Sequence, residues 1–231
     1  HNTELWNQWP QIGCKVEAFF KKRHANIAIS QSTQLCYKQI YGEIPQIIFN
    51  GLQSVKQNKF EYIIANKINI LFAGRLEYQK GVDQLIEVVN ALKYNSKFYF
   101  HIVGNGSMKG KVHKALGALT NVSFYDKIFG LNQYIGDFFY LFMPSNHEGL
   151  ALMPIEASLA HTPTIINNCP GLKDTLPEKW PLKVNNNNVT DFVQLILSLE
   201  NTTHYEEYVK TNFSIEKMQY EYEQIYKKHE I

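Results

Sequence analysis

From residue 68 onward, the hydrophobic and polar positions follow two alternating patterns. Short runs that are apolar throughout, typical of buried strands, are separated by segments with apolar residues three and four positions apart, typical of amphipathic helices. The clearest pair is the strand predicted at 68–74 (INILFAG) and the helix predicted at 80–93, which places on one face Val82, Leu85, Val88, Val89 and Leu92. Fully apolar strands that alternate with helices indicate an α/β fold, a Rossmann-like parallel sheet with helices on both faces.

The remaining elements follow from the same patterns. Further strands are predicted at 97–104, 121–125, 138–145 and 164–167, and helices at 108–116, 131–135, 152–160, 191–199 and 214–229. Before residue 68 the chain predicts a helix at 11–24, a strand at 26–30, a helix at 31–41 and a strand at 45–49. Residues 51–66 are polar and rich in Lys, Gln and Asn, which indicates a linker between this part and the main sheet.

Composition narrows the class of protein. With 23 basic and 21 acidic residues the formal net charge is +2, which argues against a nucleic-acid partner. Three scattered cysteines and no apolar run near 18 residues indicate a reduced, cytoplasmic protein. His147-Glu148 begins like a zinc-protease motif, but Ala151 stands where the second histidine is needed, so we expect no metal site.

In parallel sheets of this kind, ligands bind at the carboxyl ends of the strands. Gly74 and Arg75 follow the strand at 68–74, and Lys80 stands five residues later at the entrance of a helix. Two cations beside a helix N-terminus favour a phosphate site, because the helix adds N–H donors and a partial positive charge. Surface solubility is an equally simple explanation for the two cations when they are taken alone.

The loop after the strand at 138–145 supplies two acids. Glu148 stands in the loop, and Glu156 lies in the helix predicted at 152–160. Carboxylates opposite two cations suit a ligand with hydroxyl groups at its ends and phosphates between them. The backbone amides at the start of the helix, those of Leu150, Ala151 and Leu152, suit diphosphate oxygens. The alternative is a pair of solvated helix acids.

A glycine pair after the strand at 97–104 leaves another class open. Gly104-Asn105-Gly106 with Asp126 twenty residues later resembles a dinucleotide fingerprint, so a dinucleotide oxidoreductase stays possible on this motif alone. The fit is poor, because the third glycine comes one residue late and the turn follows the second strand of the main sheet. A tight strand-to-helix turn explains it more simply.

Four blocks, in order, resemble the retaining glycosyltransferases of family four, which have the GT-B fold. They are FNGLQSVKQNKF at 49–60, FAGRLEYQKGVDQLIEV at 72–88, HIVGNGSMKGKV at 101–112 and PSNHEGLALMPIEASLAHTPTI at 144–165. The last block carries the paired glutamates of the family in register. The resemblance implies a nucleotide-diphosphate sugar, most simply a UDP-sugar, as donor substrate and no cofactor.

The resemblance also implies residue roles. Arg75 and Lys80 would hold the diphosphate and stabilise the leaving nucleotide, and Glu148 would contact the donor sugar. Gly74 and the segment 149–152 would lie against the donor, and Glu156 would bind the ribose. Ala151 replaces a glycine of the family, and Pro170-Gly171 replaces its later Gly-Gly turn.

The length predicts an unusual division of such an enzyme. Residues 1–50 resemble the tail of the acceptor half, 67–213 the complete donor-binding half and 214–231 a closing helix. The stripe of Tyr220, Tyr222 and Tyr226 on this helix is either a docking surface or ordinary core packing. We therefore expect a cytoplasmic glycosyltransferase acting on a glycan or lipid-linked acceptor in surface polysaccharide synthesis. Peripheral attachment at the inner membrane face stays open. The alternative is a non-catalytic binding subunit that needs a separate acceptor half. A sugar-nucleotide epimerase of the same fold also stays open.

Overall fold

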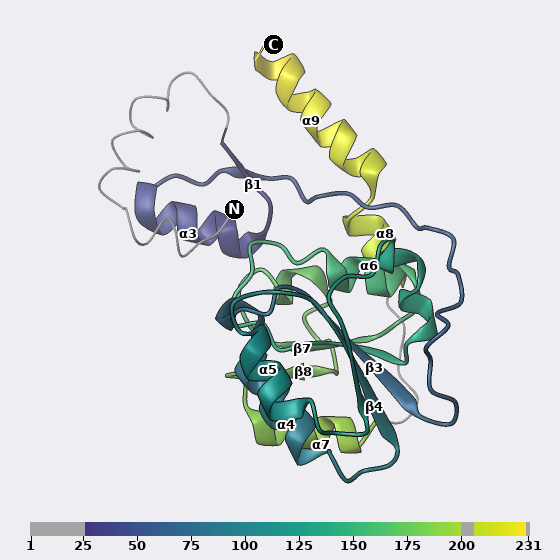
Figure 1. Ribbon diagram of the computed structural model, residues 1–231. Coiled ribbons are helices and arrows are strands. Elements are labelled where there is room, and N and C mark those ends of the chain that lie inside the picture. Colours follow the sequence, from purple (N-terminus) through teal and green to yellow (C-terminus); the bar gives the residue numbers. More distant parts are fainter. Residues whose placement is uncertain (1–25, 200–205, 230–231) are drawn as a thin grey trace.

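The computed structural model describes residues 26–199 and 206–229. In these ranges the strands form one six-stranded and one two-stranded sheet (Figure 1). The helix predicted at 11–24 lies outside the described residues.

The six-stranded sheet is parallel throughout. Its strands are β3 (Ile68–Ala73), β4 (Phe98–Val103), β5 (Val122–Tyr125), β6 (Tyr140–Met143), β7 (Thr164–Asn167) and β8 (Lys183–Val184). They lie in the order β5-β4-β3-β6-β7-β8. Renumbered from its first strand this is the 3-2-1-4-5-6 order of the doubly wound Rossmann fold, so the predicted fold class is confirmed.

Helices cover both faces of this sheet (Figure 1). On one face lie α4 (Val82–Ala91), α5 (Lys109–Leu116) and α7 (Val189–Leu197), and on the other lie α6 (Met153–Leu159) and α8 (Glu206–Asn212). The helix predicted at 131–135 is formed by two short 3-10 turns, η2 (Leu131–Gln133) and η3 (Ile135–Asp137). The sequence did not predict β8 or α8.

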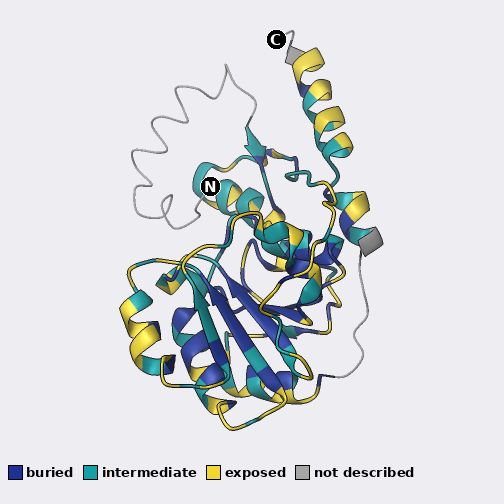
Figure 2. Cartoon of the chain, turned by 45° about the vertical axis from the view of Figure 1, so that its right-hand side comes forward, coloured by how far each residue is buried: buried dark blue, intermediate teal, exposed yellow. Residues whose placement is uncertain are grey.

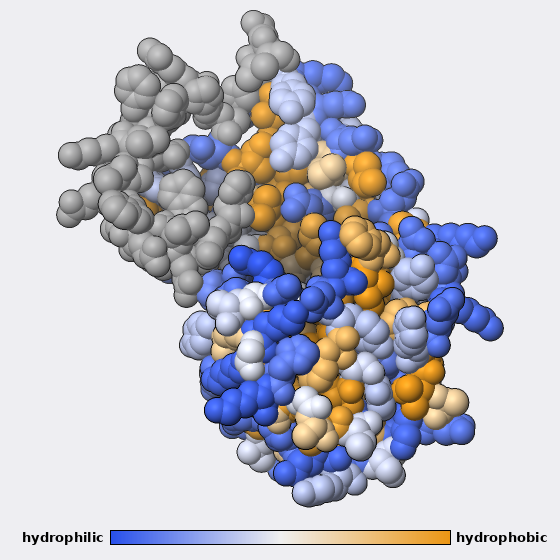
Figure 3. Space-filling model, viewed as in Figure 1, coloured by the Kyte–Doolittle hydropathy of each residue, from blue (hydrophilic) through white to orange (hydrophobic). Residues whose placement is uncertain are grey.

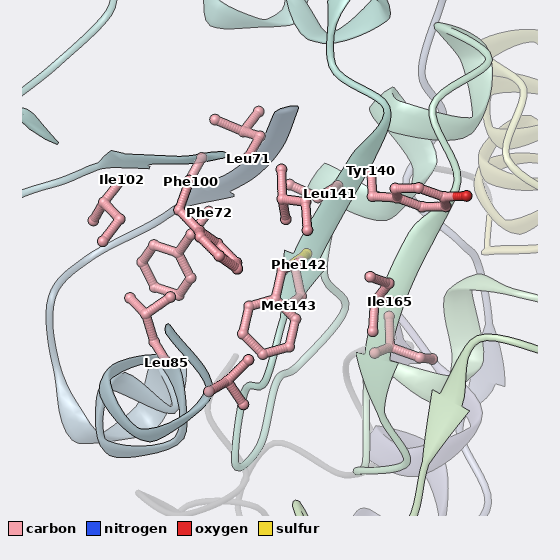
Figure 4. Packing of buried hydrophobic residues seen from close by; sticks show 14 of the residues in the cluster. Leu71, Phe72, Leu85, Phe100, Ile102, Tyr140, Leu141, Phe142, Met143 and Ile165 are labelled. Atoms are coloured by element: carbon pink, nitrogen blue, oxygen red, sulfur yellow. The ribbon is translucent and has the colours of Figure 1, made fainter. Parts of the chain in front are cut away.

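The core lies between the sheet and its helices (Figures 2 and 4). The predicted inward face of α4 is buried, with Leu85, Val88 and Val89 fully inaccessible. On the same side of the sheet, Phe142 of β6 meets Phe192 of α7 edge to face, with ring centroids 5.1 Å apart. Each large apolar side chain buried in this way contributes about 1.5–3 kcal/mol to folding, so this layer fixes the strands that carry the site.

Three polar side chains of neighbouring strands, Asn69, His101 and Tyr125, also contact one another, and we call them the His101 cluster. His101 of β4 places Nε2 2.9 Å from Oδ1 of Asn69 on β3 and Nδ1 3.3 Å from the hydroxyl of Tyr125 on β5. Because an amide oxygen only accepts, Nε2 carries the proton and Nδ1 accepts from Tyr125. Burial lowers the pKa of His101 to about 4, so the imidazole is neutral at pH 7.

The described residues before the main sheet form a small separate unit. Strands β1 (Ile27–Ala28) and β2 (Gln46–Ile47) are parallel, and α3 (Gln31–Tyr41) lies between them in the chain. Helix α3 begins with a capping box, in which Ser30 and Thr33 each accept the backbone N–H of the other. It ends at Gly42 in the left-handed conformation.

The polar segment at 51–66, predicted as a linker, is held against the main domain. The Gln57 side chain donates to Asn132 O at 2.9 Å and accepts from Gly136 N at 2.9 Å. Phe60 is only 8% exposed and packs among aromatic rings, including those of His101 and Phe138. Its polar side chains therefore bind the segment to the domain by hydrogen bonds, and we call residues 51–66 the strap.

The last helix, α9 (Ile215–His229), extends away from the six-stranded domain (Figure 1). Its predicted tyrosine stripe is partly exposed, with Tyr220 at 62% and Tyr226 at 50%. On the face in Figure 3, hydrophobic side chains gather mainly between this helix and the six-stranded domain. Of the helices in the described ranges, none is both long and apolar enough to cross a lipid bilayer.

Candidate functional site

The candidate site lies where the strand order reverses. β3 and β6 are neighbours in the sheet, but the chain leaves β3 toward one face and β6 toward the other. The crevice at the carboxyl ends of two such strands is where open α/β sheets bind ligands. Arg75 and Lys80 follow β3, and Glu148 follows β6. These three of the residues chosen from the sequence thus lie at the position that the topology favours.

Lys80 and Glu148 form an ion pair across this crevice. Lys80 Nζ donates to Glu148 Oε1 at 2.6 Å, and the two side chains are 20% and 8% exposed. The stem of Lys80 lies over Gly74, where an added Cβ would come within 3.6 Å of Lys80 Cδ. Glu148 is therefore more enclosed than a loop tip would be.

Arg75 reaches the same loop through Gln79. Arg75 Nη2 donates to Gln79 Oε1 at 3.0 Å, and Gln79 Nε2 donates to the carbonyl of His147 at 3.2 Å. Arg75 is otherwise exposed, so its guanidinium keeps donors toward solvent. Gln79 was missed in the sequence because it carries no charge, although it stands beside Lys80.

We call residues 145–152 the Glu148 loop. One side of it rests on the turn at Pro170-Gly171, where the Glu148 amide donates to Pro170 O at 3.0 Å and the Ala151 amide to Gly171 O at 3.4 Å. Gly171 has φ of +75°, and a Cβ there would lie 2.1 Å from the Glu148 carbonyl oxygen. Glycine is required at this turn both for its backbone conformation and for the close approach.

Asparagines hold the other side of the Glu148 loop. Asn167 donates to the Ser145 carbonyl at 2.8 Å, and Asn187 donates to Asn146 Oδ1 at 2.9 Å. Asn187 has φ of +52°, a left-handed conformation that asparagine tolerates better than most residues. Asn187, within the asparagine tract at 185–188, therefore has a structural role.

The residues after Glu148 are anchored rather than free. The Leu150 side chain packs into a second apolar cluster with Ile155, Val209 and Phe213, while Leu152 is 37% exposed. Helix α6 begins at Met153, one residue later than predicted. The Ala151 amide points at Gly171, so of the three amides predicted to face a diphosphate, those of Leu150 and Leu152 stay candidates.

Glu156 lies apart from the ion pair. It lines a small hollow of about 50 Å³ between α6 and the strap, together with Leu52, Gln53, Val55, Gln57, Asn132 and Leu159. Burial raises the pKa of this carboxyl group. The two predicted acids thus differ: Glu148 has a cationic partner, whereas the surroundings of Glu156 favour its neutral form.

The turn at 104–110 is a strand-to-helix connection stacked on the loop after β3. Glu77 accepts from the amide of Ser107 at 2.8 Å and from its hydroxyl at 2.6 Å. Asp126, the acid of the possible dinucleotide fingerprint, pairs with Lys109 at 2.6 Å. These partners account for the motif without a dinucleotide, and the turn follows β4 rather than the central first strand β3.

Two cations and the start of a helix make the crevice suitable for an anion. Gly81 is the N-cap of α4 and gives the helix no side-chain cap, and Lys80 directly precedes that glycine. A phosphate there would meet N–H donors and two cations. Within the described ranges no three His, Cys, Asp or Glu residues lie close enough to hold a metal ion.

Comparison with known families agrees with this fold. The family model described as "Glycosyl transferases group 1" matches residues 54–213. An uncharacterized 41.2 kDa protein in the cps region of Klebsiella pneumoniae is 29% identical over 176 residues, covering 74% of this chain and 44% of that protein. A glycogen synthase of Thermodesulfovibrio yellowstonii is 27% identical, covering 74% of this chain and 37% of that protein. The chain thus spans less than half the length of these curated relatives.

Solved structures share the fold. Anabaena Alr3699/HepE in complex with UDP and glucose superposes with a TM-score of 0.78 at 16% identity, covering 95% of this chain and 67% of that one. TarM gives a TM-score of 0.75 at 22% identity, covering 92% of this chain and 46% of that one.

Proposed function

The chain belongs to the glycosyl transferases group 1 family, and from that premise we propose that it binds a UDP-sugar at the carboxyl ends of β3 and β6. The observation that carries the proposal is the Lys80–Glu148 ion pair at 2.6 Å, with Arg75 and the start of α4 beside it. A donor of this kind has a diphosphate between two hydroxyl-bearing sugars, and the crevice offers two cations beside the carboxylate of Glu148. The UDP-bound state of HepE supports the choice of base.

Each site residue has a role in this proposal. Arg75, Lys80 and the first amides of α4 bind the diphosphate, with Gly74 leaving room for the Lys80 stem. Glu148 contacts the donor sugar, the amides of Leu150 and Leu152 bind diphosphate oxygens with Gly149 beside them, and Glu156 accepts from the ribose hydroxyls. Burial raises the pKa of Glu156, and hydroxyl donors bound to its carboxylate would favour the ionised form again.

The reaction that we propose is glycosyl transfer with retention. The bond between the anomeric carbon and the diphosphate oxygen breaks, and the acceptor oxygen bonds to the same face of that carbon. The acceptor proton passes to the leaving phosphate. Arg75 and Lys80 stabilise the charge that develops on this phosphate. A glycan or lipid-linked acceptor in surface polysaccharide synthesis fits the relative from the cps region.

A second candidate is a donor-binding half that works with a separate acceptor half. The observation that favours it is that the described residues contain one six-stranded domain, while residues 26–50 contribute two two-residue strands and one helix. UDP binding without transfer by this chain would support the second candidate. Transfer to an added acceptor would support the first.

Calorimetric titration with UDP, GDP and ADP tests the proposal. We expect UDP to bind and Arg75→Ala to weaken it by about tenfold or more, because a hydrogen bond to a charged group contributes about 1.5–3 kcal/mol. Glu156→Ala should also weaken binding. Lys93→Ala is the matched control, since this exposed lysine lies beyond the opposite end of α4.

The outcome that contradicts the proposal is equal affinity in all variants, or binding of none of the three nucleotides. A titration in EDTA checks the role of the cations. If Arg75 and Lys80 do the work of a metal, chelation leaves UDP affinity unchanged.

A further inference from the structure

The small unit before the main domain contacts the Glu148 loop through a buried hydrogen bond, beside the packing of Ile29 and Phe49 against the apolar cluster that contains Leu150. Ser30, the N-cap of α3, donates its hydroxyl hydrogen to the carbonyl oxygen of Gly149 at 2.7 Å. Ser30 is fully buried. It lies outside the region matched by the family model, which begins at residue 54. The residue that follows Glu148 is therefore held by a residue 119 positions away in the chain.

The hydrogen bonds of Ser30 separate this contact from helix capping. As a cap, Ser30 Oγ accepts the Thr33 amide at 3.1 Å, which needs only a lone pair. A hydroxyl has a single hydrogen, and Ser30 directs it at Gly149. The cap would form without the Gly149 contact, so this donation fixes the loop in addition to the helix.

A second contact lies beside the first. The amide of Ser32, in the first turn of α3, donates to Asp174 Oδ2 at 2.9 Å. Asp174 stands in the 3-10 turn η4 (Lys173–Thr175). It follows by three residues Gly171, which packs closely against the backbone of Glu148. A carboxylate at a helix N-terminus also interacts favourably with the helix dipole. Helix α3 thus binds both the Glu148 loop and the turn on which that loop rests.

We propose that the N-terminus of α3 positions the donor site: Ser30 holds Gly149, and Asp174 holds Ser32, so that Glu148 stays aligned with Lys80. Ser30 and Asp174 are positioning residues, since each acts through the Glu148 loop or its support. The inference rests on the proposed function for its consequence in donor binding, but the contact itself can be measured without a ligand.

Positioning of this kind is reciprocal. If docked α3 favours the loop conformation that binds UDP, bound UDP must favour docked α3 by the same free energy. We therefore expect UDP to slow hydrogen exchange at the amide of Ser32, which faces Asp174. Through these two contacts, binding at the donor site would strengthen the docking of the segment at 26–50.

The test compares Ser30→Ala with Thr33→Val in the full chain. Both variants remove one half of the capping box, but only Ser30→Ala removes the bond to Gly149. The readout is hydrogen exchange at the amides of Glu148 and Ala151, which donate to the turn at 170–171. Ser30→Ala should speed this exchange by about five- to tenfold and weaken UDP binding by a similar factor, as expected for one lost hydrogen bond.

Thr33→Val should change both quantities by less than about twofold, because the Gly149 contact remains. Asp174→Ala removes the second contact at a partly exposed position and should act like Ser30→Ala. Ser30→Thr, which restores a hydroxyl, should recover the lost affinity.

Equal acceleration of exchange in Ser30→Ala and Thr33→Val would overturn the proposal, because capping alone would then explain both. Loop exchange that neither Ser30→Ala nor Asp174→Ala alters would overturn it as well. If the unaltered chain binds no UDP, the proposed function fails, and the exchange comparison still decides whether α3 positions the loop.

Discussion

Two buried polar clusters lie on the same sheet, and they differ in charge and in how fully their hydrogen-bonding groups are paired. The His101 cluster lies within β3, β4 and β5, and its members are neutral. The Lys80–Glu148 pair lies just beyond the carboxyl ends of β3 and β6, and it is ionic. Both are mostly shielded from water, so burial of polar groups alone would not distinguish a binding site from a structural network.

Hydrogen-bond capacity distinguishes them. In the His101 cluster the amide of Asn69 also donates to Ile64 O and Lys67 O and accepts from Ile64 N, so its donors and acceptor are in use. Lys80 has three donors, of which one bond to Glu148 is seen, and it stands beside the exposed Arg75 and the uncapped α4. A network in which every donor and acceptor is paired stabilises the fold. Positively charged groups with further donors, such as Lys80 and Arg75, can also bind an anion.

The largest expected effect comes from breaking the ion pair. Lys80→Ala leaves Glu148 buried without its partner, and removing one partner of a buried pair costs about 3–5 kcal/mol in the free energy of unfolding. Urea denaturation measures this. Lys111→Ala is the matched control: Lys111 bonds Asp83 at the same 2.6 Å but is 58% exposed, so we expect less than about 1 kcal/mol.

A double variant sharpens this prediction. Lys80→Ala with Glu148→Gln should recover much of the lost stability, because the charge left unpaired is then absent. If the double variant instead loses the sum of the stabilities lost in the two single variants, the Glu148 carboxylate is not destabilised by the loss of Lys80.

Acid should break the other cluster. The pKa of His101 is about 4 in the folded protein against 6.5 for the free side chain, so the unfolded state binds the proton first as the pH falls. Stability is therefore fully present above pH 6.5 and is lost between 6.5 and 4, by up to about 3 kcal/mol. His101→Gln should flatten this dependence in urea titrations from pH 4 to 7. A parallel decline in both proteins would assign the loss to other groups.

A pair of glycines tests how closely the Glu148 loop is supported. Gly171 and Gly42 both have φ of +75°, but an added Cβ meets the Glu148 carbonyl at 2.1 Å in the first and nothing within 4 Å in the second. Gly42→Ala should cost only the backbone strain of about 1–2 kcal/mol. Gly171→Ala should cost about 1–3 kcal/mol more and weaken UDP binding. Equal thermal unfolding of the two variants would contradict the close contact.

The smallest change, and one of opposite sign, is expected at Glu156. Burial raises its pKa in the folded state, so its ionised form opposes folding at neutral pH. Glu156→Gln should therefore raise the free energy of unfolding at pH 7, with the gain disappearing at acid pH where Glu156 is protonated. The same variant should weaken UDP binding. Lower stability at pH 7 would argue that Glu156 has a purely structural role.

Local patterns carried most of the fold and the charged part of the site. Helix α4 and the strands β3 and β4 have strong periodicity, and Lys80 and Glu148 stand beside strand ends that apolar runs define. β8 was not predicted because it spans two residues and follows no apolar run. Ser30 and Asp174 were missed for another reason: their bonds join residues 119 and 142 positions apart, and only the folded chain brings them together.

The strand order has a consequence for the time course of folding. β3 pairs with β4 across a short crossover, whereas its other neighbour, β6, comes about twice as far along the chain. Contacts between distant segments form more slowly, so we expect β3, β4 and β5 to gain protection in pulse-labelled exchange before β6 and β7. Lys80 follows β3 and Glu148 follows β6, so the two residues lie on opposite sides of the boundary between the early and the late strands. Their pairing, and any nucleotide bound there, would thus mark the last step in assembling the sheet.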